Sequence, residues 1–402
     1  MISTQARPYI DASVPVLREH GLAITQHFYQ RMFAAHPELN DIFNLGNQAN
    51  GSQQQSLAAA VFAYAANIDN AGALQPVIER IVHKHVSVGI KPAHYPIVGR
   101  HLIASIAEVL GDAATPPLLA AWDEAYWLLA GELIAAEARL SERSGAVQGE
   151  LRMLTVMERR VESADVMSYY LQTPAGTSPG DFLPGQYVSV AVDFPGEKLR
   201  QLRQYSLSDE PAKPWWRISV RRAGDAATPA GRVSGWLHDN LKQGDTLLVG
   251  RPFGDFTPTV HASHPIVLLS AGVGITPMIS TLNALVETGS RRPILFAHAA
   301  RDGRHHALRA DLSAARANLP QLRTVAFYES PLETDRAGAD YQHVGRMDLG
   351  RILAEGDRDA EFFLCGPIGF MRQQWEALLA LGASPARIHR EVFGPELLDH
   401  LL

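Results

Sequence analysis

The chain has 402 residues, is 46% hydrophobic and carries a formal net charge of −6 at pH 7. This length predicts two or three domains, and a negative balance without a dense Lys/Arg run argues against nucleic acid or an acidic membrane surface as a partner. The single cysteine, Cys365, rules out an internal disulfide and favours a reducing compartment. Because no signal peptide or bilayer-length apolar run is evident, we expect a cytoplasmic protein with no obligate membrane contact.

The chain changes character twice, which predicts a multidomain fold. Residues 1–142 repeat apolar side chains at steps of three and four, as an all-α domain does, and "SERSGAVQG" (141–149) is the expected linker. Residues 150–260 alternate in short runs between Gly and Pro, which favours an antiparallel β-barrel. Residues 263–402 hold continuous apolar runs between helical stretches, which predicts an α/β domain with a parallel sheet. The expected strands are 186–192, 216–222, 245–250, 265–270, 293–300 and 360–366.

The stretch "IVHKHVSVGIKP" (81–92) holds two histidines that helical periodicity separates. At about 100° per residue, His85 lies in the middle of the apolar stripe with Ile78 and Ile81, whereas His83 lies about 160° away, on the solvent side. A histidine on an apolar face is either a hydrogen-bonded core residue or a ligand to a buried group, and imidazole is a common haem ligand. The pattern alone leaves both interpretations open.

Four other polar side chains fall on apolar helix faces. Tyr29 shares a face with Leu22 and with neighbouring apolar residues, Tyr95 lies on another stripe, and Gln53 heads a third. Glu137 falls within about 40° of the apolar stripe of its helix. Buried hydroxyl and carboxylate groups need partners, so these residues are candidates for a polar pocket. Glu137 could instead lie in a frayed last turn, and Gln53 could mark where its helix leaves the core.

The barrel region contains "RQYSLS" (203–208), which resembles the R-x-Y-S motif of the ferredoxin-reductase superfamily. The fork of Arg203 matches phosphate oxygens, Tyr205 can pack on a flavin ring, and the small hydroxyl of Ser206 can approach flavin N5. A helix start at Ser234 would present backbone N–H groups to phosphate. The supporting segments are "PGQY" (184–187) and "GRVSGWLHD" (231–239).

The α/β region contains "LLSAGVGITPM" (268–278), a buried strand followed by a Gly-rich turn and a helix start. Its glycines would let the backbone approach a pyrophosphate at the positive end of the helix. Pro277 replaces the third glycine of the dinucleotide fingerprint, so the segment resembles the G-x-G-x-T-P form of the reductase superfamily instead. Cys365, in "LCGP", lies where that superfamily places the nicotinamide, although a buried cysteine can also be a small core residue.

The segments "HFYQRMF", "PELNDIFN", "GSQQQSL" and "HKHVSVGIKPAHYPIVG" resemble the globin part of the flavohaemoglobins, and the resemblance continues through both later regions. It implies His85 as proximal haem ligand, with Tyr95 and Glu137 as a relay behind it. It also implies Tyr29 and Gln53 as the distal pair that hydrogen-bonds bound oxygen. Phe43 and Leu57 would line the haem pocket, and Lys84 and Glu391 would tune the redox potentials.

The same resemblance implies haem b, FAD and NAD(P)H as cofactors. The residues expected at the flavin are Tyr187, Arg203, Gln204, Tyr205, Ser206, Ser234, Val392, Phe393, Gly394 and Pro395. Those expected at the nicotinamide nucleotide are Gly272, Val273, Gly274, Ile275, Thr276, Pro277 and Cys365.

The activity that the resemblance implies is nitric oxide dioxygenase: NAD(P)H reduces FAD, FAD reduces haem, and oxygen and nitric oxide become nitrate. Two alternatives stay open, an oxygen sensor or carrier with a built-in haem reductase and a hydroperoxide reductase. NADH and NADPH are not distinguished, although Arg301 and Arg304 could meet a 2′-phosphate. The expected partners are small molecules only, with the chain as a monomer.

Overall fold

The computed structural model describes residues 2–43, 48, 51–68, 70–194, 196–197, 199–224 and 231–394. They fall into two compact units. The first comprises Met1–Leu151, Ala191–Arg203 and Gly394–Leu402, and the second comprises Arg152–Val190 and Gln204–Phe393. Both expected sheets therefore belong mainly to one unit. In the described part, no helix is long and apolar enough to cross a membrane.

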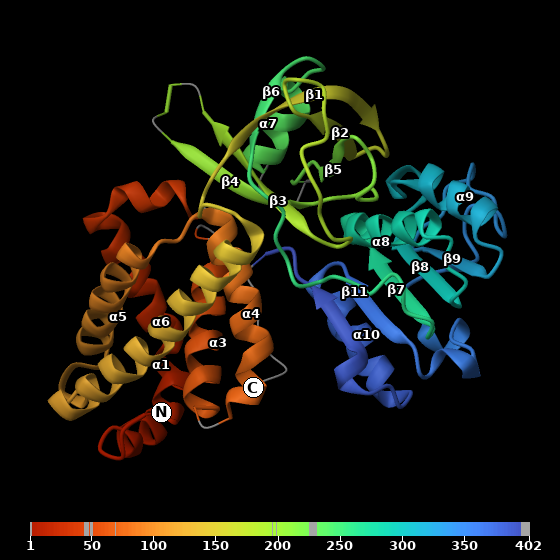
Figure 1. Ribbon diagram of the computed structural model, residues 1–402. Coiled ribbons are helices and arrows are strands. Elements are labelled where there is room, and N and C mark those ends of the chain that lie inside the picture. The colour runs from red at the N-terminus through yellow and green to blue at the C-terminus, as the bar shows by residue number, and fades with distance from the viewer. Residues whose placement is uncertain are drawn as a thin grey trace. The chain divides into compact units, whose positions relative to one another are not determined.

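The first unit is a bundle of α-helices (Figure 1). Its long helices are α1 (Arg7–Ala35), α3 (Ser52–Ala66), α4 (Ala71–Val88), α5 (Tyr95–Leu110) and α6 (Pro116–Ser144), and its 3₁₀ turns are η1 (Pro37–Asp41), η2 (Pro92–His94) and η3 (Gly111–Ala113). Ile10, Ile24, Phe28, Leu102 and Trp122 are among the residues of its common core. The expectation of an all-α region is confirmed.

One apolar position of α1 was predicted wrongly. Leu22 was expected to face inward with Tyr29, yet it is exposed, whereas Tyr29 is buried. The buried row of α1 is centred near Phe28, and Leu22 lies about 20° beyond Tyr29, just outside the edge of that row. The apolar face predicted from the position of Tyr29 was therefore rotated away from the face that is buried.

The antiparallel sheet has the strand order β4-β3-β6-β1-β2-β5. Its strands are β1 (Arg152–Val161), β2 (Val166–Gln172), β3 (Tyr187–Asp193), β4 (Arg200–Ser206), β5 (Trp216–Arg221) and β6 (Thr246–Val249), and the helix α7 (Arg232–Asn240) accompanies them. An antiparallel bridge joins Leu207, directly after the edge strand β4, to Ile218 of the other edge strand β5. The two edges of the sheet thus meet at one point, as they do where a sheet closes on itself.

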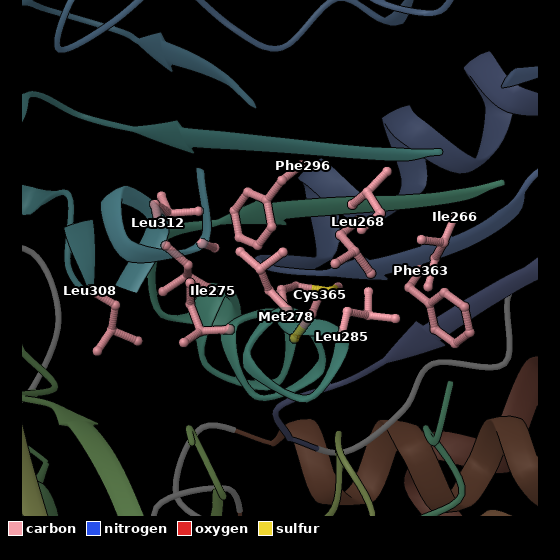
Figure 2. Close-up of a cluster of buried hydrophobic side chains, with 14 of the residues drawn as sticks. Ile266, Leu268, Ile275, Met278, Leu285, Phe296, Leu308, Leu312, Phe363 and Cys365 are labelled. Atoms are coloured by element: carbon pink, nitrogen blue, oxygen red, sulfur yellow. The ribbon is translucent and has the colours of Figure 1, made fainter. Parts of the chain in front are cut away.

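The second sheet is parallel throughout, in the order β10-β9-β8-β7-β11-β12. Its elements are β7 (Ile266–Ala271), η4 (Gly272–Gly274), α8 (Ile275–Glu287), β8 (Ile294–Ala300), η5 (Gly303–His305), α9 (Arg309–Asn318), β9 (Leu322–Tyr328), β10 (His343–Val344), η6 (Leu349–Arg351), η7 (Glu355–Asp357), β11 (Glu361–Cys365), α10 (Ile368–Ala380), η8 (Pro385–Arg387) and β12 (Ile388–Glu391). Leu268 packs toward α8 and α9, as Figure 2 illustrates, and Leu269 packs toward α10. Both faces are covered, which is why the central strands β7, β8 and β11 are mostly apolar on both of their faces.

The order of the parallel strands places β7 between β8 and β11. From β7 the chain proceeds to β8, β9 and β10 on one side, then returns to β11 and β12 on the other. The turns that follow β7 and β11 therefore diverge at a topological switch point, where open α/β sheets bind ligands at the carboxyl ends of their strands.

Candidate functional site

The first unit brings three sequence-predicted polar residues into one cluster. Glu137 Oε1 lies 2.8 Å from Nδ1 of His85 and accepts a hydrogen bond of 2.5 Å from the Tyr95 hydroxyl. The Tyr95 hydroxyl also lies 3.2 Å from the same Nδ1. Glu137 is buried, so the alternative of a frayed last turn is wrong. Burial and the hydrogen bond with Glu137 both raise the pKa of Tyr95, which stays a neutral donor.

Helix ends and one further tyrosine hold this cluster in place. Tyr95 begins α5, directly after the turn η2, and Pro96 occupies the first turn, where its missing N–H costs nothing. The hydroxyl of Tyr126 donates to the backbone carbonyl of Tyr95 at 2.5 Å. A side chain at Gly99 would meet the ring of Tyr126 at 2.5 Å. Sequence reasoning did not single out Tyr126 and missed this anchoring contact.

Burial does not distinguish the two histidines of α4. Helical periodicity placed His83 on the solvent side and His85 in the middle of the apolar stripe, but both side chains are half-buried. What singles out His85 is the buried carboxylate on its Nδ1.

The environment of His85 fits a haem iron. Glu137 fixes the tautomer with a proton on Nδ1 and leaves a lone pair on Nε2. Nε2 has no hydrogen-bond partner among the described residues, and the His85 side chain retains 31% exposure. An imidazole oriented through one nitrogen by a carboxylate, with the other nitrogen available, is the usual arrangement of a metal-bound histidine.

A second polar site in the same unit surrounds Tyr29 of α1. Burial raises the pKa of Tyr29 to about 12, and hydrogen bonds with the side chains of Gln53 and Gln48 oppose this shift. The ring of Tyr29 stacks on Phe33 at 5.8 Å and meets the edge of Phe43 at 5.9 Å. The structure thus brings Tyr29, Gln53 and Phe43 together. Gln48 was missed, since nothing in its sequence context marks it.

Leu57 lies on α3 one turn after Gln53 and packs, partly buried, against the core of the first unit. The buried residues of α3 are Phe62, Ala63 and Ala65. The face led by Gln53 is therefore only half-covered within the described residues.

In the antiparallel sheet, the R-x-Y-S segment forms the end of β4. Nη1 of Arg203 donates to the carbonyl of Leu202 at 2.7 Å and to Gln201 Oε1 at 3.3 Å. Gln204 is exposed and Tyr205 half-buried, whereas Ser206 is buried. The Ser206 hydroxyl has no hydrogen-bond partner among the described residues. A buried hydroxyl without a partner costs free energy, so this group fits a site that a bound molecule completes.

Tyr187 and Ser234 lie on β3 and in the first turn of α7. Tyr187 is buried, and a Cβ at Gly254 would come within 3.2 Å of its ring. The Ser234 hydroxyl accepts from the Ala223 N–H at 3.0 Å and contacts the Gly231 carbonyl at 3.3 Å. The Ser234 side chain therefore stabilises the loop that precedes α7. Its backbone N–H is one of the first N–H groups of that helix, which have no acceptor within the helix.

The segment after β12 contains the remaining flavin candidates. Glu391 and Val392 are buried, and Phe393 is exposed. Gly394 has φ +142°, a region that suits glycine. Lys84 Nζ donates to the Gly394 carbonyl at 2.8 Å. Pro395 lies outside the described residues.

The nucleotide candidates form one compact turn at the switch point. Gly272 has φ +54°, and a Cβ at Gly274 would lie 2.2 Å from the carbonyl oxygen of Cys365. Only glycine permits this approach of the two diverging turns. The hydroxyl of Thr276 donates to the Val273 carbonyl at 3.0 Å and secures the start of α8. Ile275, Thr276 and Pro277 are buried in the first turn of that helix.

Cys365 itself belongs to the hydrophobic core, where Figure 2 shows its sulfur beside Met278 and Leu285. Burial, followed by the nearby charge of Glu391, raises the pKa of its thiol well above the ordinary value. The side chain is thus a core residue, and only its backbone reaches the Gly272–Pro277 turn.

Arg301 and Arg304, after β8, are both exposed. Arg304 lies 3.9 Å from Asp302. Asp302, which sequence reasoning missed, is buried and accepts from the N–H groups of Arg304 and His305. Its carboxylate reduces the positive charge that these arginines would offer a 2′-phosphate.

Comparison with known families agrees with this division of the chain. The Globin family model matches residues 26–133, the Oxidoreductase FAD-binding domain matches residues 153–257, and the Oxidoreductase NAD-binding domain matches residues 268–375.

Similar proteins span the full length of the chain. A flavohemoprotein of Bordetella parapertussis is 49% identical over 98% of this chain and 99% of its own length. The crystal structure of a flavohemoglobin from Malassezia yamatoensis, with bound FAD and heme, is 28% identical with a TM-score of 0.85, covering 98% of this chain and 100% of that one. The FAD/NAD-binding domain of a nitric oxide dioxygenase from Vibrio cholerae is 37% identical with a TM-score of 0.55, over 61% of this chain and 99% of that one.

Proposed function

Because the chain belongs to the flavohaemoprotein family, we propose that it is an NAD(P)H- and oxygen-dependent nitric oxide dioxygenase. The observation that carries the proposal is the His85–Glu137–Tyr95 cluster. The same chain has an antiparallel sheet with the R-x-Y-S segment and a parallel sheet with the Gly272–Pro277 turn. An oxygen carrier needs neither of the last two features for reversible binding. A dioxygenase needs them, because each turnover consumes an electron.

The cofactors are haem b, FAD and NAD(P)H, as the haem and FAD of the Malassezia relative support. When bound, the flavin accepts a hydride and passes single electrons to haem, where oxygen and nitric oxide combine to nitrate. We assign the haem to a domain of residues 1–142, FAD to 150–260 and the nucleotide to 263–402. The location is cytoplasmic, the partners are small molecules only, and the chain acts as a monomer.

His85, Glu137 and Tyr95 act together on the proximal side. His85 offers Nε2 to the iron, while Glu137 takes the hydrogen bond from Nδ1–H at 2.8 Å. A carboxylate acceptor makes the imidazole more basic and more electron-donating. Tyr95 donates to the same carboxylate oxygen at 2.5 Å and keeps it directed at the histidine. This arrangement favours reductive chemistry over simple storage of oxygen.

Tyr29 and Gln53 act on the distal side. The raised pKa of Tyr29 keeps its hydroxyl protonated at neutral pH, so it can donate a hydrogen bond to a small polar ligand such as dioxygen. Phe33 and Phe43 hold the ring in place. Gln53 and Gln48 give that hydroxyl partners when no ligand is present.

The reductase residues position the two nucleotides. Ser206 offers its unpartnered hydroxyl to the flavin, and Arg203 and the first turn of α7 offer charge and N–H groups to phosphate. The turn Gly272–Gly274 brings backbone N–H groups to the pyrophosphate of NAD(P)H at the start of α8. Lys84, next to His85 in α4, and Glu391, at the end of β12, tune the haem and flavin potentials.

The test is turnover of nitric oxide by the purified holoprotein. Nitric oxide, nitrate and NADH are followed together in the presence of oxygen, and the proposal predicts that nitrate forms and that each NADH supports two nitric oxide molecules consumed. Parallel runs with NADPH and with an alkyl hydroperoxide compare the donors and the competing reductase activity. Oxygen binding without nitrate formation, or faster turnover of the hydroperoxide than of nitric oxide, would reject the proposal.

A further inference from the structure

A pocket of about 310 Å³ opens at the amino ends of two parallel strands in the second unit. Two segments line it: Val260–Ser263, which precedes β7, and the stretch from Thr288 to Arg292, which joins α8 to β8. The nucleotide turn lies at the opposite end of β7. At about 3.3 Å per residue, the strand separates the two by roughly 20 Å, so this pocket is distinct from the site described above.

A buried arginine lines this pocket. Arg292 is only 3% exposed. Its Nε donates to the His264 carbonyl at 2.7 Å, and its Nη1 donates to the Thr259 carbonyl at 2.9 Å. Nη2 has no hydrogen-bond partner among the described residues. The guanidinium is thus fixed in place with one nitrogen left for another acceptor.

The charge of Arg292 is not neutralised in the described part of the chain, where no carboxylate lies within ion-pair distance. Burial lowers the pKa of Arg292, and the more distant charge of Glu361 opposes this only in part. Glu361 is already engaged by His389 at 2.6 Å. Buried charges are normally paired, so this cation calls for an anion.

The other polar residues that line the pocket also offer positive charge or hydrogen-bond donors. Arg291 is exposed and makes no ion pair with any described residue. His261 and the hydroxyls of Ser263 and Ser290 add potential donors, and no Asp or Glu lines the pocket. Near the carboxyl end of α8, the carbonyls of Ala284, Leu285 and Val286 already accept from backbone N–H groups and do not compete for these donors.

We propose that this pocket binds a phosphoryl group, held between the guanidinium groups of Arg291 and Arg292 with hydroxyl and imidazole donors around it. The planar fork of Arg291 matches two oxygens of a tetrahedral dianion, and Nη2 of Arg292 supplies one further charge-assisted hydrogen bond. A free phosphate ion fills only part of the volume, so the pocket also accommodates the organic part of a small phosphate ester.

The site lies on the connection between the two nucleotide-binding regions. Residues 258–267 fall between the segments that match the FAD- and NAD-binding family models. Arg292 already ties this connection to the α8–β8 loop through Thr259 and His264. A bound phosphoryl group adds further contacts to Ser263 and His261 on the same connection.

The test is calorimetric titration of the holoprotein, saturated with NAD⁺ so that the nucleotide site is blocked, in a buffer free of phosphate and sulfate. Inorganic phosphate and glycerol 3-phosphate are the two probes. We expect millimolar or tighter binding of at least one. Tighter binding of the ester assigns the site to a phosphate ester, and tighter or equal binding of phosphate assigns it to the free ion; both results support the site.

Two variants and a control locate the binding. Arg291→Gln and Arg292→Lys should each weaken the affinity at least tenfold, since each removes charge-assisted hydrogen bonds. Arg316→Gln, which removes an exposed arginine of α9, should leave it unchanged. Arg291 is exposed, so its variant is informative even if Arg292→Lys does not fold. Absence of binding with both probes, or wild-type affinity in Arg291→Gln, would overturn the proposal.

Discussion

The His85–Tyr95–Glu137 cluster and the Gly272–Pro277 turn are built in opposite ways. His85, Tyr95 and Glu137 come from α4, α5 and α6, and 52 positions separate the two partners of the central hydrogen bond. The Gly272–Pro277 turn is continuous in sequence, and its tight contact with a distant segment is that of Gly274 with the carbonyl of Cys365. The first site therefore depends on helix packing, and the second depends on local backbone geometry.

Because of this difference, substitutions at the two sites should impair different properties of the protein. A change in the turn should alter the backbone but spare the helical bundle, and a change in the cluster should alter the electronics of one imidazole but spare hydride transfer. The substitutions below are ordered from the largest expected effect to the smallest.

Gly274→Ala should have the largest effect. The added methyl group would lie 2.2 Å from the Cys365 carbonyl oxygen, so the turn must move. Loss of two charge-assisted contacts to a pyrophosphate, at about 1.5 kcal/mol each, slows flavin reduction at low NADH roughly a hundredfold. Stopped-flow absorption of the flavin after mixing with NADH measures this rate.

The matched control for this change is Gly369→Ala in α10, where a Cβ meets no atom within 4 Å. It should reduce its flavin at the wild-type rate. In Gly274→Ala, carbon monoxide binding after chemical reduction should also be unchanged. If Gly274→Ala reduced its flavin normally, the turn would not be the nucleotide site.

Glu137→Gln tests the cluster with almost no change of shape. The amide oxygen can still accept from His85 Nδ1–H, but the negative charge behind the imidazole is lost. Partners of this kind contribute about 10–100-fold to metal affinity, so haem transfer to apomyoglobin should accelerate by about that factor. The haem midpoint potential should rise, because the ligand donates less electron density. Glu142→Gln, at an exposed position of the same helix, should change neither quantity.

Tyr29→Phe removes one hydroxyl from the distal site. A hydrogen bond to a partly charged ligand contributes roughly 1.5–3 kcal/mol, so oxygen should dissociate from the reduced protein about ten- to a hundredfold faster. Carbon monoxide, which is less polar, should respond much less. Because the pKa of Tyr29 is raised to about 12, the wild-type oxygen off-rate should not vary between neutral pH and pH values near 10. An unchanged off-rate in the variant would remove Tyr29 from the ligand site.

Ser206→Ala should give the smallest effect, and it should change FAD affinity without lowering the stability of the protein. Its hydroxyl has no partner among the described residues, so the variant without FAD should be as stable as the wild type or slightly more stable, while FAD binds several-fold more weakly. Ser208→Ala is the contrast, because the Ser208 hydroxyl lies 2.8 Å from that of Ser219. It should destabilise the protein by about 1 kcal/mol with FAD affinity unchanged. Thermal unfolding and flavin titration on both variants check this; equal destabilisation of the two would contradict it.

The same contrast explains how much the sequence could predict. The strands at β7, β8 and β11 were found within a residue or two, because both faces of that sheet are covered and the pattern is continuous. Periodicity correctly placed Glu137 inside, because a carboxylate on an apolar stripe is conspicuous. It misplaced Leu22, since a wide buried face can be centred on several rows. Gln48 and Asp302 were missed because their partners are set by tertiary packing and by a local cap, which no single residue type marks.

The most direct test of the account is one measurement on His85→Ala: its absorption spectrum while NADH is mixed with the FAD-loaded protein under anaerobic conditions. We predict that the haem bands are absent or weak, whereas the flavin band bleaches at the wild-type rate. His83→Ala, two residues away and equally half-buried, should keep normal haem bands. Full haem content in His85→Ala, or equal haem loss in both variants, would contradict the assignment of His85 and with it the proposed haem site.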